Sequence, residues 1–201
     1  IVRCFEDPDV VHVHGSVNPK NDIEVINTEL MLADLDTVEK KLARLEKAAK
    51  SGNKEALEEQ GVAIALKEAL NSGKPARTVK VEGGDKEKYF KAFQLLTAKP
   101  VLYVANVDEA GLSEDNQFVK QVKEIAAQEG AKVVVICGDV ESEIAELPTD
   151  ERAEYLKGMG LKESGLDRMI KAGYELLGLS TYFTAGVKEV RAWTIPRGAK
   201  A

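Results

Sequence analysis

The chain has 201 residues, of which 44% are hydrophobic and 31% charged, and its formal net charge at pH 7 is −6. This composition suits one sizeable globular domain, or a domain with an insertion, that has a long exposed helical part. The negative charge excludes a chain that attracts nucleic acid over its whole surface. No hydrophobic run approaches the about 20 residues of a membrane span, so we expect no membrane partner and no signal peptide.

The first residues resemble the middle of a buried strand. Ile1 to Phe5 are mostly hydrophobic, with no methionine and no polar residue before them, so we expect a part of the protein to precede Ile1. Pro8 ends the strand, because proline cannot donate to a ladder, and this leaves Phe5 at the strand's end. His12 and His14 share one side of an extended segment. No nearby Cys or third His completes a metal site, so we interpret both as ordinary residues.

A long helical pattern follows a predicted loop at residues 18–22, with Asp22 as the expected N-cap. From Asp36 the hydrophobic residues alternate in steps of four and three, which is typical of a coiled coil. These residues are Val38, Leu42, Leu45 and Ala49. Ser51 and Gly52 end this helix, and a second helix ends near residue 73. Two such helices predict an antiparallel hairpin that projects as an independent arm, either structural or partner-binding.

Strands and helices alternate after the arm. The predicted elements are a helix at 86–96, a buried strand at 101–105, a helix at 112–129 and a second buried strand at 131–137. The first of these helices is expected to bury Tyr89, Phe90, Phe93 and Leu96. This alternation requires a parallel sheet with right-handed crossovers, and the hydrophobic strands require helices on both faces.

Polar residues follow both buried strands, at the edge where ligands of open α/β sheets bind. Asn106 can donate and accept in one plane, so it can read the edge of a base. Val107 can cover the face of a ring, and Glu109 can accept from ring or amino donors. Gly138, after Cys137, permits a close backbone approach to a ligand. The alternative is that the strand simply ends in a polar turn.

The two cysteines, Cys4 and Cys137, lie in or at the end of predicted strands. Reduced, packed thiols in a cytosolic protein are a simpler interpretation than a disulfide. Phe5, next to Cys4, either faces the same edge as Asn106 or is a core residue.

The last part of the chain reads as helices followed by a β-hairpin. Helices are expected at 141–147, 150–157 and 163–176, with Pro148 between the first two. The segments 180–184 and 188–195 favour strands, and the turn between them predicts a hairpin. This hairpin differs from the preceding pattern, so we expect it to begin another small domain.

The three strand ends together resemble the base-binding edge of a P-loop nucleotide hydrolase. GTPases of this class carry Asn-Lys-x-Asp, whereas this chain has Asn106-Val107-Asp108-Glu109. The pattern Asn-x-x-Glu is the mark of the Obg-like ATPase family, also called YchF. Further runs that resemble this family are Arg3 to Asp7, Val17 to Pro19, Asp22-Ile23, Glu29-Leu30, Thr181 to Gly186 and Val190 to Trp193.

The resemblance implies a cytoplasmic, ribosome-linked ATPase that prefers ATP to GTP. It implies that Asn106 contacts the adenine edge, and that Val107 and Phe5 pack on the two faces of the ring. Glu109 stands where GTPases read guanine, and its longer side chain no longer fits that role. Cys137 and Gly138 match the last nucleotide loop of the family. The resemblance also leaves room for an RNA contact through the arm and the hairpin.

The expected fold class is α/β, with a partial P-loop NTPase sheet, an inserted antiparallel coiled-coil arm and the start of a C-terminal TGS domain. The nucleotide-binding part comprises residues 1–33 and 86–179. The arm comprises residues 34–85, and the TGS segment comprises residues 180–201.

The chain contains no GxxxxGK[ST] loop, and we expect both this loop and the family's Asp-x-x-Gly switch segment to precede Ile1 in the parent protein. Those parts hold the phosphates and Mg²⁺ of the nucleotide. We therefore expect the base-reading half of a site without its phosphate half, and assign no catalytic or metal residue. The complete protein is expected to be an ATPase and this chain alone to be inactive. The alternatives are a nonenzymatic nucleotide- or ribosome-interaction module and, less favoured, a guanine-specific GTPase.

Overall fold

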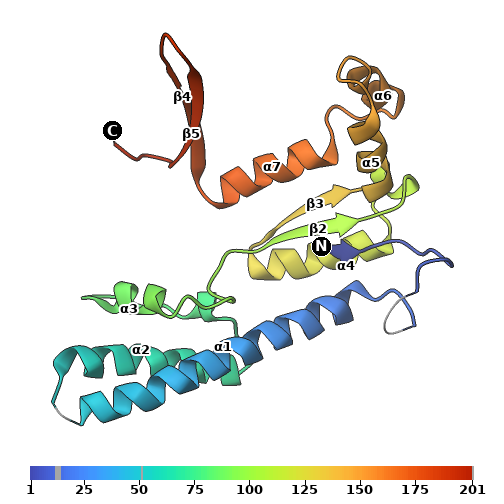
Figure 1. Cartoon of the computed structure of the whole chain (residues 1–201). Helices are drawn as coiled ribbons and strands as arrows, with labels where there is room; N and C mark the ends of the chain where they lie inside the picture. Colours follow the sequence, from blue (N-terminus) through green and yellow to red (C-terminus); the bar gives the residue numbers. More distant parts are fainter. Residues whose placement is uncertain (12–14, 51, 201) are drawn as a thin grey trace. The chain divides into compact units, whose positions relative to one another are not determined.

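The computed structural model describes residues 1–11, 15–50 and 52–200, so the predictions for His12, His14 and Ser51 concern residues outside the described part. The chain divides into two compact units (Figure 1). The sheet unit comprises Ile1–Lys20 and Val101–Ala201, and the helical unit comprises Asn21–Pro100. Each is described by itself.

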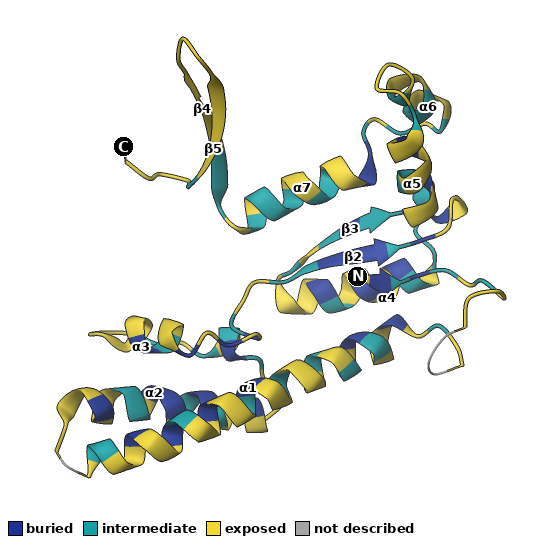
Figure 2. Ribbon diagram, in the orientation of Figure 1, coloured by how far each residue is buried: buried dark blue, intermediate teal, exposed yellow. Residues whose placement is uncertain are grey.

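In the described residues, the sheet unit contains a parallel sheet whose strand order is β1 (Val2–Arg3), β2 (Leu102–Asn106) and β3 (Lys132–Ile136). Helices α4 (Gln117–Glu129) and α7 (Gly165–Leu176) both pack on β2 and β3. They cover opposite faces of the sheet (Figure 1). Figure 2 shows that the middle of β2 is buried between them. The predicted parallel sheet, covered on both faces, is therefore confirmed.

Side-chain caps and strand ends decide where the helices of this unit begin. The amide oxygen of Asn116 accepts hydrogen bonds from the N–H groups of Phe118 and Val119, so α4 begins later than the predicted residue 112. A 3₁₀ turn, η2 (Ala110–Leu112), occupies the start of the predicted range. Helix α5 (Gly138–Glu146) begins directly after β3, earlier than predicted, and α6 (Arg152–Gly158) follows it.

The end of the sheet unit is the predicted β-hairpin. Strands β4 (Leu179–Ala185) and β5 (Val190–Pro196) pair antiparallel, with Tyr182 opposite Trp193. The indole N–H of Trp193 donates to the hydroxyl of Thr184 at 2.8 Å. The hydroxyl groups of Tyr174 and Thr194 lie 3.3 Å apart, which ties α7 to the base of the hairpin.

The helical unit contains most of α1 (Pro19–Ala49), together with α2 (Lys54–Asn71), η1 (Ala76–Thr78) and α3 (Lys86–Ala92). Helix α1 begins at Pro19, where the missing N–H costs nothing. Asp22 therefore lies in the first turn of the helix, and the prediction that it is the N-cap is wrong. The side chain of Asn53 caps α2 by accepting from the N–H of Ala56 at 3.1 Å. The two predicted long helices are therefore present, and the first is longer than expected.

One hydrophobic core joins the two long helices to the segment after them. Its buried members are Val38, Leu42, Leu45, Ala56, Val62, Ala63, Leu66, Leu70, Ala76, Tyr89, Phe93 and Leu95. Leu96, which was expected to be buried with them, is 43% exposed. This packing explains why the unit extends to Pro100, whereas the sequence predicts an arm that ends at residue 85. No helix in the described residues is both long and hydrophobic enough to span a bilayer.

A buried carboxylate holds the end of the helical unit. Asp34 is 2% exposed, and its two oxygens accept from the N–H groups of Leu96 and Thr97, each at 2.7 Å. The hydroxyl of Thr97 in turn accepts from the N–H of Ala76 at 2.9 Å. Because each contact satisfies a backbone donor, the segment before β2 is fixed to α1 and η1 by polar contacts as well as by the core.

Candidate functional site

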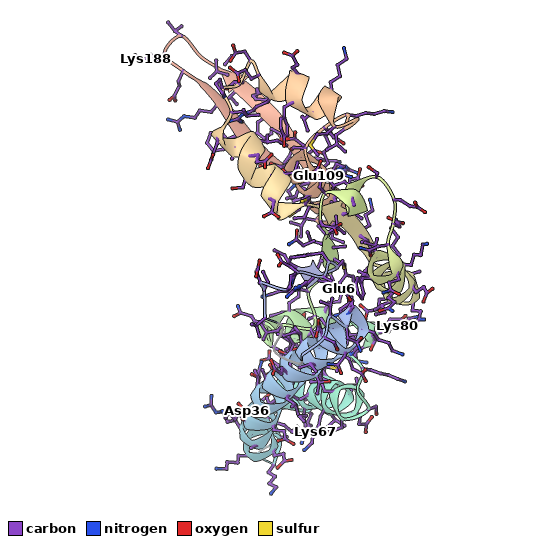
Figure 3. All side chains as sticks on the ribbon, turned by 90° about the vertical axis from the view of Figure 1, so that its right-hand side faces the viewer. Glu6, Asp36, Lys67, Lys80, Glu109 and Lys188 are labelled. Carbon is purple, nitrogen blue, oxygen red and sulfur yellow. The ribbon has the colours of Figure 1, made fainter. Side chains whose placement is uncertain are left out.

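The carboxyl ends of the three parallel strands lie level with one another. Arg3 is opposite Asn106, and Asn106 is opposite Ile136. The N–H of Cys4 donates to the carbonyl of Asn106 at 2.7 Å, and the N–H of Val107 donates to the carbonyl of Ile136 at 2.8 Å. The structure thus brings together the three places from which the predicted site residues come: Phe5, Asn106 and Cys137. In Figure 3, which faces the carboxyl ends of the strands, Glu6 and Glu109 are labelled on this side of the sheet unit.

The side chain of Asn106 bridges β2 and the start of α5. Its amide oxygen Oδ1 accepts from the N–H of Gly138 at 2.9 Å. In the described part of the chain, the amide nitrogen Nδ2 makes no hydrogen bond to protein, and the residue is only partly buried. Asn106 therefore has one group committed to the fold and one donor left for a ligand.

Val107 is buried rather than presented at the edge. It is 2% exposed, and a Cβ atom placed on Gly111 would lie 2.7 Å from its own Cβ, so only glycine fits there. The carboxylate of Asp108 closes the same turn by accepting from the N–H of Gly111 at 2.9 Å. The contact of Val107 with a ring face stays a prediction, and its side chain presents little surface for it in this structure.

Glu109 lies exposed at the beginning of η2, with helical backbone angles of −57° and −41°. No partner of its carboxylate is found among the described residues. The charge of Glu109 also affects the pKa of Tyr155 in α6, whose hydroxyl donates to the carboxylate of Glu143 in α5. This hydrogen bond, followed by burial and the charges of Glu143 and Glu109, raises the pKa of Tyr155 to about 12. A free carboxylate thus stands within electrostatic reach of Tyr155.

Phe5 is partly buried, and Arg3 covers one face of its ring. The guanidinium carbon of Arg3 lies 4.8 Å from the ring centroid. The same side chain donates to the carbonyls of Phe5 at 3.1 Å, Asp7 at 3.3 Å and Val10 at 2.9 Å. Arg3 therefore shapes the loop after β1, a role that the sequence did not reveal because its partners are backbone carbonyls.

The cavity beside this loop does not coincide with the predicted site. It has a volume of 480 Å³ and is lined by Arg3, Glu6, Asp7, Pro8, Val10, Val11, Gly15, Ser16 and Val17. None of Asn106, Glu109, Cys137 and Gly138 lines it. This cavity therefore does not define the predicted site.

Both cysteines are free and buried, as predicted. Burial raises the pKa of the Cys4 thiol to about 12, so this thiol stays protonated at neutral pH. Cys137 is 1% exposed and precedes the first residue of α5. Its side chain is packed in the interior, and its backbone forms part of the loop. The N–H of the next residue, Gly138, donates a hydrogen bond to Asn106.

Comparison with known proteins shows similarity along the whole chain. It is 51% identical over 201 residues to the ribosome-binding ATPase YchF of Pasteurella multocida, and 51% identical over 203 residues to that of Bacillus subtilis. Each match covers 100% of this chain and 55% of the relative. The resemblance to the YchF family and the α/β fold predicted from the sequence are therefore confirmed.

A solved YchF protein has the same fold. The structure of the Schizosaccharomyces pombe YchF GTPase superposes with a TM-score of 0.86 at 31% identity, over 100% of this chain and 55% of that one. No protein-family model matches the chain. The chain spans about half the length of these YchF relatives, so what their names say of nucleotide and ribosome applies to the relatives themselves.

Proposed function

We propose that this chain carries the base-recognition half of the ATP site in a ribosome-associated nucleotide hydrolase of the YchF type. The observation that supports this is the Asn106 amide, whose oxygen is held by the Gly138 N–H at 2.9 Å while its nitrogen remains available. It stands at level strand ends, where α/β sheets bind ligands. The names of the bacterial relatives, ribosome-binding ATPases, support the choice of nucleotide and partner.

Asn106 supplies affinity for purines rather than a choice between them. Its free amide nitrogen is a donor, and adenine and guanine both present the N7 acceptor. The choice depends on the neighbouring group, which is a carbonyl acceptor in guanine and an amino donor in adenine. The Gly138 N–H, which could serve the guanine carbonyl, is already bound to Asn106. The free carboxylate of Glu109 can only accept, and this suits the adenine amino group.

The remaining parts of the reaction lie outside the residues we assign. The chain has no GxxxxGK[ST] loop, and in the described residues no group of three or more His, Cys, Asp or Glu side chains could hold a metal ion. The residues present therefore do not fit Mg²⁺ and the phosphates, and no step of hydrolysis is assigned to them. The full-length protein is the ATPase, and these 201 residues alone are inactive. A turnover with ATP and Mg²⁺ of about 1 per second by the isolated chain would contradict this.

The proposal also includes ribosome binding, a cytoplasmic location and an RNA contact through the helical unit and the hairpin. In it, residues 180–201 begin the TGS domain. The alternative to an ATPase is a nonenzymatic nucleotide- or ribosome-interaction module. A second candidate for the nucleotide is GTP, which the description of the Schizosaccharomyces pombe relative as a GTPase favours. The same edge serves both candidates, because the Asn106 donor fits either purine.

Two substitutions at Asn106 separate binding from folding. Asn106→Asp keeps an oxygen for the Gly138 N–H but loses the donor, whereas Asn106→Ala loses both groups. In calorimetric titrations of ATP and GTP into the full-length protein, we expect both variants to bind about tenfold more weakly than the wild type. Asn106→Asp should unfold at the wild-type temperature. Wild-type affinity for ATP in both variants would show that this edge is only a polar turn.

A further inference from the structure

Glu141 joins two helices at the proposed site. It lies in the first turn of α5 and accepts from two N–H groups of α7, those of Gly165 at 2.6 Å and Leu166 at 3.1 Å. These are the first two N–H groups of α7, which have no partner inside the helix. A carboxylate that faces helix N-termini is also favoured by their positive ends.

The contact is enforced by the packing around Gly165. A Cβ atom placed on this glycine would lie 2.8 Å from Cγ2 of Ile136 and 2.8 Å from the Glu141 carboxylate. Only glycine therefore allows the start of α7 to reach the last residue of β3 and the first turn of α5 together. Sequence reasoning missed Glu141, because its partners are backbone donors with no side-chain pattern.

Helix α7 has another cap, but α5 has none of its own. The hydroxyl of Ser164 accepts from the Asp167 N–H at 3.0 Å, which is the usual N-cap contact for α7. Cys137 gives α5 no side-chain cap. The start of α5 is instead held by the Asn106 contact to Gly138, by buried Val140 and by the Glu141 bridge. The bridge therefore matters more for the loop at Gly138 than for α7.

We propose that Glu141 is a positioning residue for base recognition, whose bridge to the start of α7 fixes Gly138 and thereby the amide of Asn106. This inference rests on the proposed function. Asn106 can present its donor in one orientation only while Gly138 stays in place, since that N–H determines which end of the amide faces the ligand. A supporting contact of this kind governs affinity without touching the nucleotide.

The test uses the full-length protein with three matched substitutions. Glu141→Ala removes the bridge, and Glu141→Gln keeps one neutral acceptor for it. Ser164→Ala removes the α7 cap but leaves the bridge intact. We measure ATP affinity by calorimetry, amide hydrogen exchange at residues 137–141 without nucleotide, and the unfolding temperature.

The bridge predicts three results. Glu141→Ala weakens ATP binding about tenfold and speeds exchange at 137–141, and Glu141→Gln recovers part of both. Ser164→Ala lowers the unfolding temperature but leaves ATP affinity and exchange at 137–141 close to wild type. If Ser164→Ala weakens ATP binding as much as Glu141→Ala, the role of Glu141 is merely structural. Unchanged affinity and exchange in Glu141→Ala would likewise overturn the inference.

Failure of the proposed function gives a different signature. If wild-type protein binds no purine nucleotide, the proposed function fails, and with it the role of Glu141 in base recognition. If the wild type binds ATP, the Asn106 variants bind it more weakly, and the Glu141 variants keep wild-type ATP affinity and exchange, the proposed function stands and the inference fails. Should Glu141→Ala fail to fold, the comparison of Glu141→Gln with Ser164→Ala decides by the same criteria.

Discussion

Asp34 in the helical unit and Asn106 in the sheet unit make the same kind of contact, because each accepts from backbone N–H groups of a distant segment. Asp34 uses both oxygens, each at 2.7 Å from a donor, and is 2% exposed. Asn106 uses only its oxygen, on one donor at 2.9 Å, and is partly exposed. The first is a saturated structural contact, and the second leaves a polar group for a ligand.

The surroundings of the two residues follow the same division. Asp34 lies in the helical unit, which has a continuous hydrophobic core, and buried polar groups there need hydrogen-bond partners. Asn106 stands at the carboxyl end of β2, three residues before the free carboxylate of Glu109. The saturation of a polar side chain is thus a better guide to its role here than its residue type or its place in the sequence.

The largest expected effect is the loss of Phe93, which is 4% exposed in the core of the helical unit, with the Lys41 ammonium 4.1 Å from its ring centroid. Phe93→Ala should lower the free energy of unfolding by about 3–5 kcal/mol, because it opens a cavity. Urea unfolding followed by circular dichroism measures the change. The partly buried neighbour Phe90 is the control, and Phe90→Ala should cost clearly less.

This core also changes the expectation for the arm. The sequence predicts an independent arm, but deletion of residues 36–72 would uncover Tyr89 and Phe93. This deletion should leave the parallel sheet folded and unfold the segment from Ala76 to Thr97. Equal losses in the Phe93→Ala and Phe90→Ala proteins would contradict this view of the core.

The next effect tests the saturated side of the comparison. Asp34→Ala leaves the N–H groups of Leu96 and Thr97 without an acceptor, and should lower the free energy of unfolding by about 2–4 kcal/mol. Asp36→Ala is the matched control. The Asp36 side chain is 61% exposed in its pair with Lys40, so its loss should change stability by less than about 0.5 kcal/mol. Equal unfolding midpoints for the two variants would remove the distinction drawn here.

Sequence patterns predicted the elements whose causes are local or periodic. The hydrophobic run at 101–105 predicted β2, and the spacing from Val38 onward predicted the long helices. Parallel strands must end at one edge, so the convergence of Asn106 and Gly138 could also be predicted. The sequence did not show what covers the long helices, because a stripe of leucine and valine fits a coiled coil and a small helical core equally well.

The contacts that could not be predicted join side chains to backbone donors far along the chain. Asp34 bonds to residues 62 and 63 positions away, and Glu141 to residues 24 and 25 positions away. A backbone N–H leaves no trace in the residue type that carries it. Val107 is a residue that was expected to be exposed and is buried. Its place directly after β2 suggested exposure, whereas the turn at Gly111 covers its side chain.

Glu109 tests the unsaturated side of the comparison. Glu109→Gln replaces a group that can only accept by one that also donates, so it can serve the guanine carbonyl as well as the adenine amino group. We expect the preference for ATP over GTP to narrow about tenfold, measured by calorimetry on the full-length protein. Val107→Lys together with Glu109→Asp would rebuild the GTPase pattern, but Val107 is 2% exposed and a buried charge would disturb the turn. An unchanged ratio in Glu109→Gln would remove Glu109 from base choice.

The smallest effect concerns the electrostatic link between Glu109 and Tyr155. The hydrogen bond to Glu143 is the largest cause of the raised pKa of Tyr155, about 12, and the Glu109 charge adds to it. Glu143→Gln should therefore lower this pKa most, and Glu109→Gln by a smaller amount, because each removes a negative charge that opposes ionisation. NMR of ¹³Cζ-labelled tyrosine between pH 9 and about 12 measures it, with Tyr155→Phe to assign the signal.

The sign of the effect on stability follows from the direction of this shift. The pKa is higher in the folded protein than in the unfolded chain, so the contribution is complete below about pH 10 and is lost as the pH rises through about 12. Tyr155→Phe should therefore flatten the alkaline end of the stability profile and leave it unchanged near neutral pH. If Glu109→Gln leaves the pKa of Tyr155 unchanged, the Glu109 carboxylate does not lie close to Tyr155. The argument that this carboxylate is the free acceptor for the base is then weaker.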